Sequence, residues 1–197
     1  DLTLNVTGTV TQSAGDVITA NGLQLLGTGA VNLDDANNVT TIAISHSGTI
    51  SYRDINALVV GTVTDSAMAP NTTTSGITNN ADVKLTTGGN LTIGVAADGG
   101  VHDITITGGN DLTLNVTGSV TQLAGDVITA NGLQLLGNGA VNLDDANNVT
   151  TLAASHTGTI SYRDINALVV GTVADSAMGT TTNDGITNAG DVKLTVD

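Results

Sequence analysis

The sequence predicts an all-β fold without helices, built as a β-solenoid in which similar coils stack along one axis. Short alternating apolar segments follow one another with polar corners between them, and the apolar residues are almost all aliphatic. A long internal repeat also contains a shorter spacing of the size expected for one coil. At roughly 20–27 residues per coil and about 4.8 Å per step, the chain would hold about eight or nine coils.

The individual strands follow from alternation with period two, which is typical of strands with one buried face. Residues 1–7 alternate in this way, and Gly8 ends the segment. Further along, a turn is expected at residues 35–38 and a polar corner at residues 53–56. The strands predicted around these two interruptions are residues 31–34, 39–44, 49–52 and 57–63.

Nearly all of the chain is a repeat. Residues 111–178 reproduce residues 1–68 with seven substitutions, at a sequence period of 111 − 1 = 110. The period falls to 185 − 76 = 109 after the segment 69–75, which contains the only proline and is therefore predicted to be an exposed loop. No linker separates the copies. Residues 1–110 are thus predicted to form a first solenoid repeat and residues 111–197 a second, truncated one, in a continuous solenoid.

A shorter spacing lies inside the long repeat. The segment 87–93 recurs at residues 107–114, so the spacing is 107 − 87 = 20. This is about the length of one solenoid coil. A coil cannot bury its apolar face alone, so stability is expected to grow as coils stack.

Composition predicts a narrow interior. The chain has no Phe or Trp and only two Tyr and two Met. A globular core usually contains aromatic residues, because each buries ~150–250 Å². The interior is therefore predicted to consist of stacked aliphatic side chains.

Charge excludes several classes of partner. All 18 acidic residues are Asp, against four basic residues, and the formal net charge is -14. Asp favours turns whereas Glu favours helices, so the acidity marks corners. It also argues against binding to nucleic acid or to an anionic membrane surface. The chain has no Cys and no apolar run long enough to span a bilayer. It begins at Asp1 without Met and is expected to be an interior part of a longer protein.

Three runs of sequence carry a resemblance to a known family. They are NGLQLLGTGAVNLDDANNV at residues 21–39, GTISYRDINALVVGTV at residues 48–63 and GIT…DVKLTTGGNLTIG at residues 76–94. In this order they resemble the repeat regions of filamentous-haemagglutinin-like exoproteins, bacterial surface adhesins exported by two-partner secretion. The resemblance implies a right-handed parallel β-helix shaft and an extracellular place on the bacterial cell surface. It covers nearly the whole chain, which contains no identifiable secretion domain or binding tip.

Candidate calcium ligands are few, and no residue is assigned as catalytic, cofactor-binding or metal-binding. The pairs Asp34–Asp35 and Asp144–Asp145 carry the carboxylate oxygens that Ca²⁺ prefers. Adjacent strand residues are expected to point to opposite faces, which opposes a shared ion. Residues 108–112 are similar to a calcium-binding nonapeptide repeat but lack its tandem copies.

The remaining polar candidates are predicted to be structural. His46, His102 and His156 are predicted to be surface histidines without catalytic partners. The dipeptides Arg53–Asp54 and Arg163–Asp164 are predicted to be exposed corners that pair between coils. The asparagine pairs at 37–38 and 147–148 are predicted to begin a ladder of side-chain amides along the axis.

The predicted function is a structural shaft or filament segment of a large secreted or surface-attached bacterial fibrous adhesin. With Lys84, Lys193, Arg53 and Arg163 as the only basic residues, no enzyme and no cofactor are expected. The expected partners are further copies of the same repeat along the fibre axis, joined by chain length or by end-to-end self-assembly. Alternatives are tandem immunoglobulin-like adhesin domains, which a repeat of this length would suit, and an ice-binding or calcium-binding β module.

Overall fold

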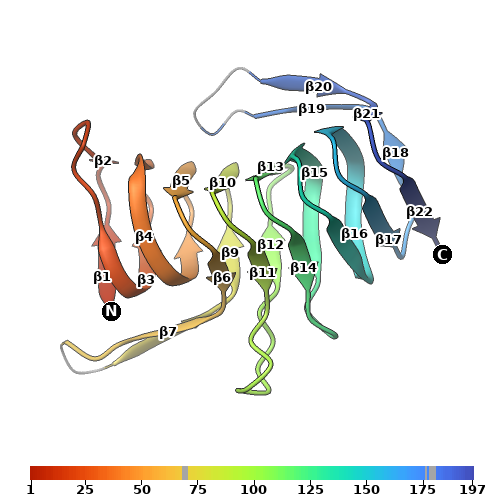
Figure 1. The fold of residues 1–197 in the computed structure, drawn as a ribbon. Coiled ribbons are helices and arrows are strands. Elements are labelled where there is room, and N and C mark those ends of the chain that lie inside the picture. Colours follow the sequence, from red (N-terminus) through yellow and green to blue (C-terminus); the bar gives the residue numbers. More distant parts are fainter. Residues whose placement is uncertain (68–70, 176, 178–180) are drawn as a thin grey trace.

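The structure is a computed structural model that describes residues 1–67, 71–175, 177 and 181–197. These residues form 22 strands and no helix, so the all-β prediction is confirmed. Eighteen strands belong to one large sheet, and the other four form two separate two-stranded sheets. Figure 1 shows the strands of the large sheet standing side by side from the N-terminus to the C-terminus.

The two copies of the repeat contain corresponding strands. Those of the first copy are β1 (Leu2–Val6), β2 (Val10–Thr11), β3 (Thr19–Gly27), β4 (Val31–His46), β5 (Ile50–Asp54), β6 (Leu58–Val60), β7 (Thr62–Asp65), β8 (Thr72–Ser75), β9 (Ile77–Asn79), β10 (Val83–Thr87), β11 (Leu91–Ile93) and β12 (Ile104–Ile106). Those of the second are β13 (Asp111–Val116), β14 (Val120–Gln122), β15 (Ile128–Gly137), β16 (Val141–His156), β17 (Ile160–Asp164), β18 (Val169–Val170), β19 (Thr172–Ala174), β20 (Thr182–Asp184), β21 (Ile186–Asn188) and β22 (Val192–Val196).

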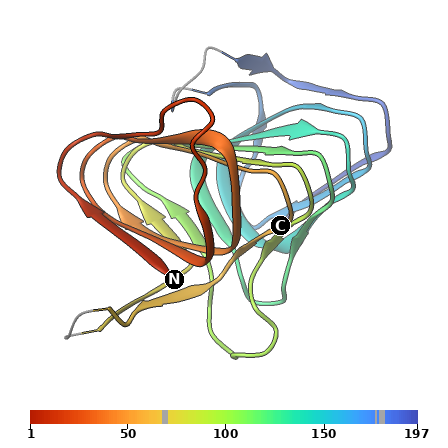
Figure 2. The same ribbon diagram turned by 60° about the vertical axis from the view of Figure 1, so that its left-hand side comes forward.

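Strands of the large sheet pair in parallel, layer upon layer. Leu2 pairs with Leu23, and Leu23 pairs with Ile42, at sequence separations of 23 − 2 = 21 and 42 − 23 = 19. The step from Ile50 to Val83 is longer, 83 − 50 = 33, because the hairpin of β7 and β8 is inserted there. Seen from near one end, successive turns of the chain surround a common interior (Figure 2).

The prediction of a right-handed parallel β-helix, a β-solenoid of eight or nine coils, is wrong. The pairings close into a ring of nine parallel strands, topologically a parallel β-barrel, with the other strands outside it. The ring runs β4–β5–β10–β13–β15–β16–β14–β11–β6 and returns to β4. It closes because β4 and β16 are continuous strands of 16 residues that pair with different neighbours along their length.

The turn predicted at residues 35–38 is also wrong, since β4 runs through it. The register of β4 against β5 shifts between Leu33 and Asn37, which marks a bulge. The buried side-chain amide of Asn37 donates to the carbonyl oxygens of Leu33, at 2.9 Å, and Arg53, at 3.0 Å. These bonds satisfy the backbone at the bulge, so the chain changes direction without leaving the sheet.

The short spacing predicted as one coil does not correspond to a strand pairing. Residues 83–87 pair with residues 112–116, at a sequence separation of 112 − 83 = 29. Leu91 pairs with Val120 at the same separation. The segments 87–93 and 107–114 resemble each other because each contains a turn followed by a strand, and they occupy different places in the layers.

The interior is aliphatic, as composition predicts, with two tyrosines added. One cluster of buried Leu, Ile and Val side chains extends from Leu23 to Tyr162 through both copies. Tyr52 and Tyr162 are the largest fully buried side chains of the described residues. At the first layer the cluster is incomplete, because Leu2, Leu4 and Val6 are only partly buried.

One column of glycines allows the layers to approach closely at a corner. A Cβ atom on Gly29 would lie 1.6 Å from the carbonyl oxygen of Gly8, and one on Gly48 would lie 2.3 Å from that of Gly29. No side chain fits at these two positions without moving the backbone. Gly8 begins the column, and a Cβ atom there would meet nothing within 4 Å.

Two antiparallel hairpins stand outside the large sheet. The first is β7 with β8, and the second is β19 with β20. The exposed loop predicted at residues 69–75 is partly strand, because Thr72–Ser75 is β8, while residues 68–70, including Pro70, lie outside the described residues. The two hairpins leave opposite edges of the molecule in Figure 1.

The register explains why equivalent hairpins face different ways. Four pairings lead from Val10 through Val31, Ile50 and Val83 to Leu112. Leu112 is the equivalent of a residue in β1, whereas Val10 lies in β2. One repeat therefore advances the chain by four layers and one strand position, so each copy is turned relative to the copy before it.

Candidate functional site

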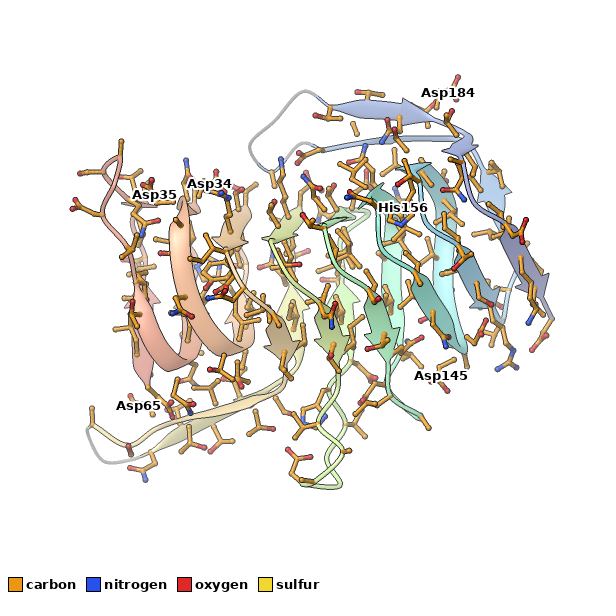
Figure 3. The ribbon with its side chains drawn as sticks, viewed as in Figure 1. Asp34, Asp35, Asp65, Asp145, His156 and Asp184 are labelled. Atoms are coloured by element: carbon orange, nitrogen blue, oxygen red, sulfur yellow. The ribbon has the colours of Figure 1, made fainter. Side chains whose placement is uncertain are left out.

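The aspartates that were considered as calcium ligands are hydrogen-bond acceptors between layers. Oδ1 of Asp34 accepts from the Ser51 hydroxyl at 2.6 Å, and Oδ1 of Asp35 accepts from the backbone N–H of Gly15 at 3.1 Å. Asp144 and Asp145 repeat both contacts in the second copy. Figure 3 shows Asp34 and Asp35 at one edge of the molecule. Among the described residues, no group of three or more His, Cys, Asp or Glu side chains is arranged to hold a metal ion.

The histidines are buried, so their predicted surface placement is wrong. His46 and His156 are 6% and 4% exposed, and His102 is fully buried. Nδ1 of His46 accepts from the N–H of Gly48 at 2.9 Å, and burial lowers the pKa of this histidine. Nε2 of His156 lies 2.6 Å from the carbonyl oxygen of Gly139, to which it donates. Both rings therefore close turns at the glycine corners.

His102 contacts Asp98 in its own loop, Thr62 in the first hairpin and Asp126 in the second copy. Its Nε2 lies 3.0 Å from Oδ2 of Asp98 and 3.1 Å from the hydroxyl of Thr62. Its backbone N–H donates to Oδ1 of the buried Asp126 at 2.6 Å. The imidazole of His102 thus holds the long loop between β11 and β12 against the first hairpin, and the carboxylate of Asp126 holds it against the next layer.

The aspartates predicted as exposed corners are buried caps. Asp54 is 1% exposed. Its Oδ2 accepts from the N–H of Val39 at 2.7 Å and from the Tyr52 hydroxyl at 2.8 Å, and its Oδ1 accepts from the N–H of Asn56 at 2.9 Å. Asp164 repeats the arrangement. The neighbouring arginines differ: Arg53 is exposed, and Arg163 pairs with Asp197.

The predicted asparagine ladder exists only as separate contacts between layers. The amide of Asn56 donates to Asn38 at 3.1 Å. Asn37 instead accepts from the amide of Gln12 at 2.7 Å and from the N–H of Ile18 at 2.8 Å. The second copy repeats these contacts. They connect neighbouring layers without forming one continuous ladder.

The two copies of the repeat meet at a junction that is formed by strand pairing. Three parallel pairings cross it, β10 with β13, β11 with β14 and β12 with β15. Leu112, Leu114 and Val116 on β13 are at most 1% exposed. The second copy therefore continues the sheet and core of the first.

An ion pair reinforces this junction. Lys84 on β10 extends its ammonium group to Oδ2 of Asp175, at 2.6 Å. Asp175 follows β19 in the second hairpin and is 2% exposed. A buried carboxylate needs such a partner, because an unpaired charge in the interior is costly. Sequence analysis missed this pair, since its partners lie far apart in the chain and nothing in the repeat pattern predicts that a hairpin folds back over an earlier layer.

In each copy, a buried glutamine fastens the hairpin to the first layers of that copy. The amide of Gln24 donates to the carbonyl oxygen of Thr72 at 3.1 Å and to the hydroxyl of Thr74 at 2.8 Å, and its oxygen accepts from the Thr3 hydroxyl at 2.9 Å. Gln134 holds the second hairpin and Thr113 in the same way. Each hairpin thus lies against the first layers of its own copy.

In the comparisons with known proteins, no family model, no curated protein and no solved structure matches this chain. The part of the chain that the structure describes contains no helix long and apolar enough to cross a membrane.

Proposed function

We propose that this chain is a structural segment of a large fibrous bacterial surface protein, of the filamentous-haemagglutinin-like kind that the sequence runs resemble. Its role is to carry a distal part of that protein away from the cell, in the extracellular space. Length is gained by adding copies, each of which joins the copy before it through strand pairing. No reaction is assigned to it.

The observation that carries this proposal is the continuity of the junction. Three parallel pairings and one ion pair with a buried carboxylate connect the copies, with no linker between them. A joint of this kind resists bending, because changing its angle would break backbone hydrogen bonds and uncover apolar side chains. Tandem sandwich domains would instead have separate cores joined by flexible connections.

The test is a series of chains in which one or two further copies of residues 1–110 are inserted before Asp111. Small-angle X-ray scattering should show a longest dimension that increases by a constant amount per copy, with an unchanged cross-sectional radius. Flexible beads, or a particle that widens as it grows, would contradict the proposal. Immunolabelling of intact cells that make the parent protein tests the surface location, and labelling only after lysis would exclude it.

A further inference from the structure

The ion pair at the junction brings two groups that can react with each other into contact. Nζ of Lys84 lies 2.6 Å from Oδ2 of Asp175. An amine and a carboxyl group can condense to an amide with loss of water. Holding the two groups in contact replaces an encounter in solution by a step within one molecule, which lowers the barrier to such a reaction.

Both side chains are held in place by the fold. Lys84 lies within β10, which pairs with β5 on one side and with β13 on the other. Its neighbours Val83 and Leu85 are buried in the core, so Lys84 points outward, where the second hairpin lies. Asp175 follows β19 in that hairpin, which the amide of Gln134 anchors. The amine and the carboxyl group therefore stay together.

The surroundings of the pair favour a neutral product over two charges. The side chain of Asp175 is buried, and that of Lys84 is only 20% exposed. Burying two charges is costly even when they are paired. In addition, Oδ1 of Asp175 has no hydrogen-bond partner among the residues that the structure describes. Condensation removes both charges and one carboxylate oxygen, so it relieves this cost.

A second carboxyl group beside the pair can supply a proton. Asp82 lies directly before β10, and its Oδ1 accepts from the backbone N–H of Asp111 at 2.8 Å. Burial raises the pKa of Asp82, this hydrogen bond opposes the shift, and the negative charges of Asp111 and Asp175 add to it. A carboxyl group of this kind keeps its proton at a pH where an ordinary aspartate has lost it. It can therefore act as a general acid on its neighbour.

We propose that Lys84 and Asp175 form an intramolecular isopeptide bond across the junction, with Asp82 as the proton donor. Nζ passes one proton to the carboxylate of Asp175 and then attacks its carbon Cγ. As the bond between Nζ and Cγ forms, the bond between Cγ and the hydroxyl oxygen breaks. The hydroxyl leaves as water with a proton from Asp82, which takes back the proton that the attacking nitrogen loses. Two charges disappear, one water molecule is released, and no other reactant is needed.

The bond adds a covalent link to the strand pairings of the junction. It closes a loop between residues that are 91 positions apart in the sequence. Closing a loop restricts the unfolded chain and so raises the free energy of unfolding. This inference goes beyond the proposed function and does not depend on it.

The mass of the denatured chain tests the bond directly. The purified protein should be lighter than its sequence by one water molecule. Trypsin locates the bond, because it does not cleave after a lysine whose amine is acylated. The cleavage sites in this chain are Arg53, Lys84, Arg163 and Lys193. The digest should therefore contain residues 54–163 joined to residues 164–193, again short of one water molecule.

Lys84→Arg is the matched variant, because arginine keeps the ion pair but does not form this amide. It should have the full mass of its sequence and unfold at a lower denaturant concentration than the original chain. Lys193→Arg changes an exposed lysine and should keep the loss of water.

Asp82→Asn tests the proton donor, since it keeps an acceptor for the N–H of Asp111 but carries no acidic proton. Masses recorded at intervals after cell-free synthesis give the rate of bond formation, which should fall about a hundredfold in this variant. In the original chain the rate should also fall as the pH is raised through the pKa of Asp82, and the variant should lack this dependence.

A full sequence mass, with residues 54–84 released as a separate tryptic peptide, would overturn the inference. A loss of water that persists in Lys84→Arg would do so as well, because it would place the cross-link elsewhere. An unchanged rate in Asp82→Asn would remove this residue from the reaction. These outcomes are distinct from failure of the proposed function, which the scattering series tests without reference to a covalent link.

Discussion

At the residue scale, the two tyrosines connect stability to pH. Tyr52 and Tyr162 are fully buried beside aspartates, and burial followed by the nearby carboxylate raises the pKa of each hydroxyl well above its ordinary value of 10.0. The folded chain keeps these protons at a pH where the unfolded chain loses them. The free energy of unfolding should therefore be insensitive to these groups below pH 10 and should fall above it, by about 1.4 kcal/mol per pH unit for each tyrosine.

Denaturant titrations from pH 8 to about pH 12 measure this slope, because this pH range spans the ordinary tyrosine pKa. Tyr52→Phe should lower stability throughout, because Asp54 loses a donor, but should remove about half of the alkaline slope. Tyr52→Phe with Tyr162→Phe should remove nearly all of it. An equally steep slope in the double variant would show that these tyrosines are not its source.

Glycine at the corner is required by backbone contact rather than by a positive φ. Gly29→Ala should destabilise the chain by about 1–3 kcal/mol, because its Cβ atom meets the carbonyl of Gly8. Gly8→Ala is the matched control in the same column, and its Cβ atom meets nothing within 4 Å, so its cost should be much smaller. Thermal unfolding of the two variants checks this, and equal losses would refute the close contact.

The sequence predicted which residue types fill the interior and the corners, but it did not predict the burial of polar residues whose partners come close only in the folded chain. Aliphatic residues and glycine corners follow from the sequence, because period-two alternation and small residues mark buried faces and turns. The burial of His46 and Asp54 does not, since their partners are backbone groups that come close only in the folded chain. In the sequence alone, Asp54 looks like an exposed corner residue, because the backbone N–H groups that donate hydrogen bonds to it are not evident there.

At the element scale, each hairpin depends on one buried glutamine. Gln24→Leu should release β7 and β8 from the first layers, because three hydrogen bonds to the hairpin and one from Thr3 are lost. Amide hydrogen exchange in the first hairpin should become roughly tenfold to a hundredfold faster, for a local loss of about 1–3 kcal/mol. The second hairpin, held by Gln134, is the internal control and should not change.

Gln134→Leu is the reciprocal variant and should release only the second hairpin. Since Lys84 also pairs with Asp175 next to β19, its effect should be smaller than that of Gln24→Leu. An increase of exchange in both hairpins from either change would mean that they are not held independently.

The sequence predicted the positions of the strands better than it predicted how the strands pair with one another. The alternating segments all contain strands, but the predicted strand 57–63 is divided at Gly61 into β6 and β7, and β7 leaves the large sheet. β4 runs through the predicted turn because Asn37 satisfies the backbone at the bulge, and Asn147 does the same in β16. These long strands close the pairings into a ring, which period-two patterns cannot reveal. The inserted hairpins were hidden as well, since a strand that leaves the sheet and a strand within it show the same alternation.

At the scale of the whole molecule, the repeat acts as a step of fixed size. Four layers and one strand position separate Leu2 from Leu112, and a layer contains three strand positions, at Leu2, Val10 and Ala20. With layers about 4.8 Å apart, each copy should advance by about 21 Å and turn by about a third of a revolution. The hairpins, one per copy, mark this step on the outside.

The most direct test of this account is cryo-electron microscopy of a chain with two further copies of residues 1–110 inserted before Asp111, using the hairpins as markers. A repeat that acts as a fixed step should give a straight particle whose successive hairpins are about 21 Å apart along the axis and turned by about a third of a revolution each time. Hairpins aligned on one side, or separate bodies joined at variable angles, would contradict it.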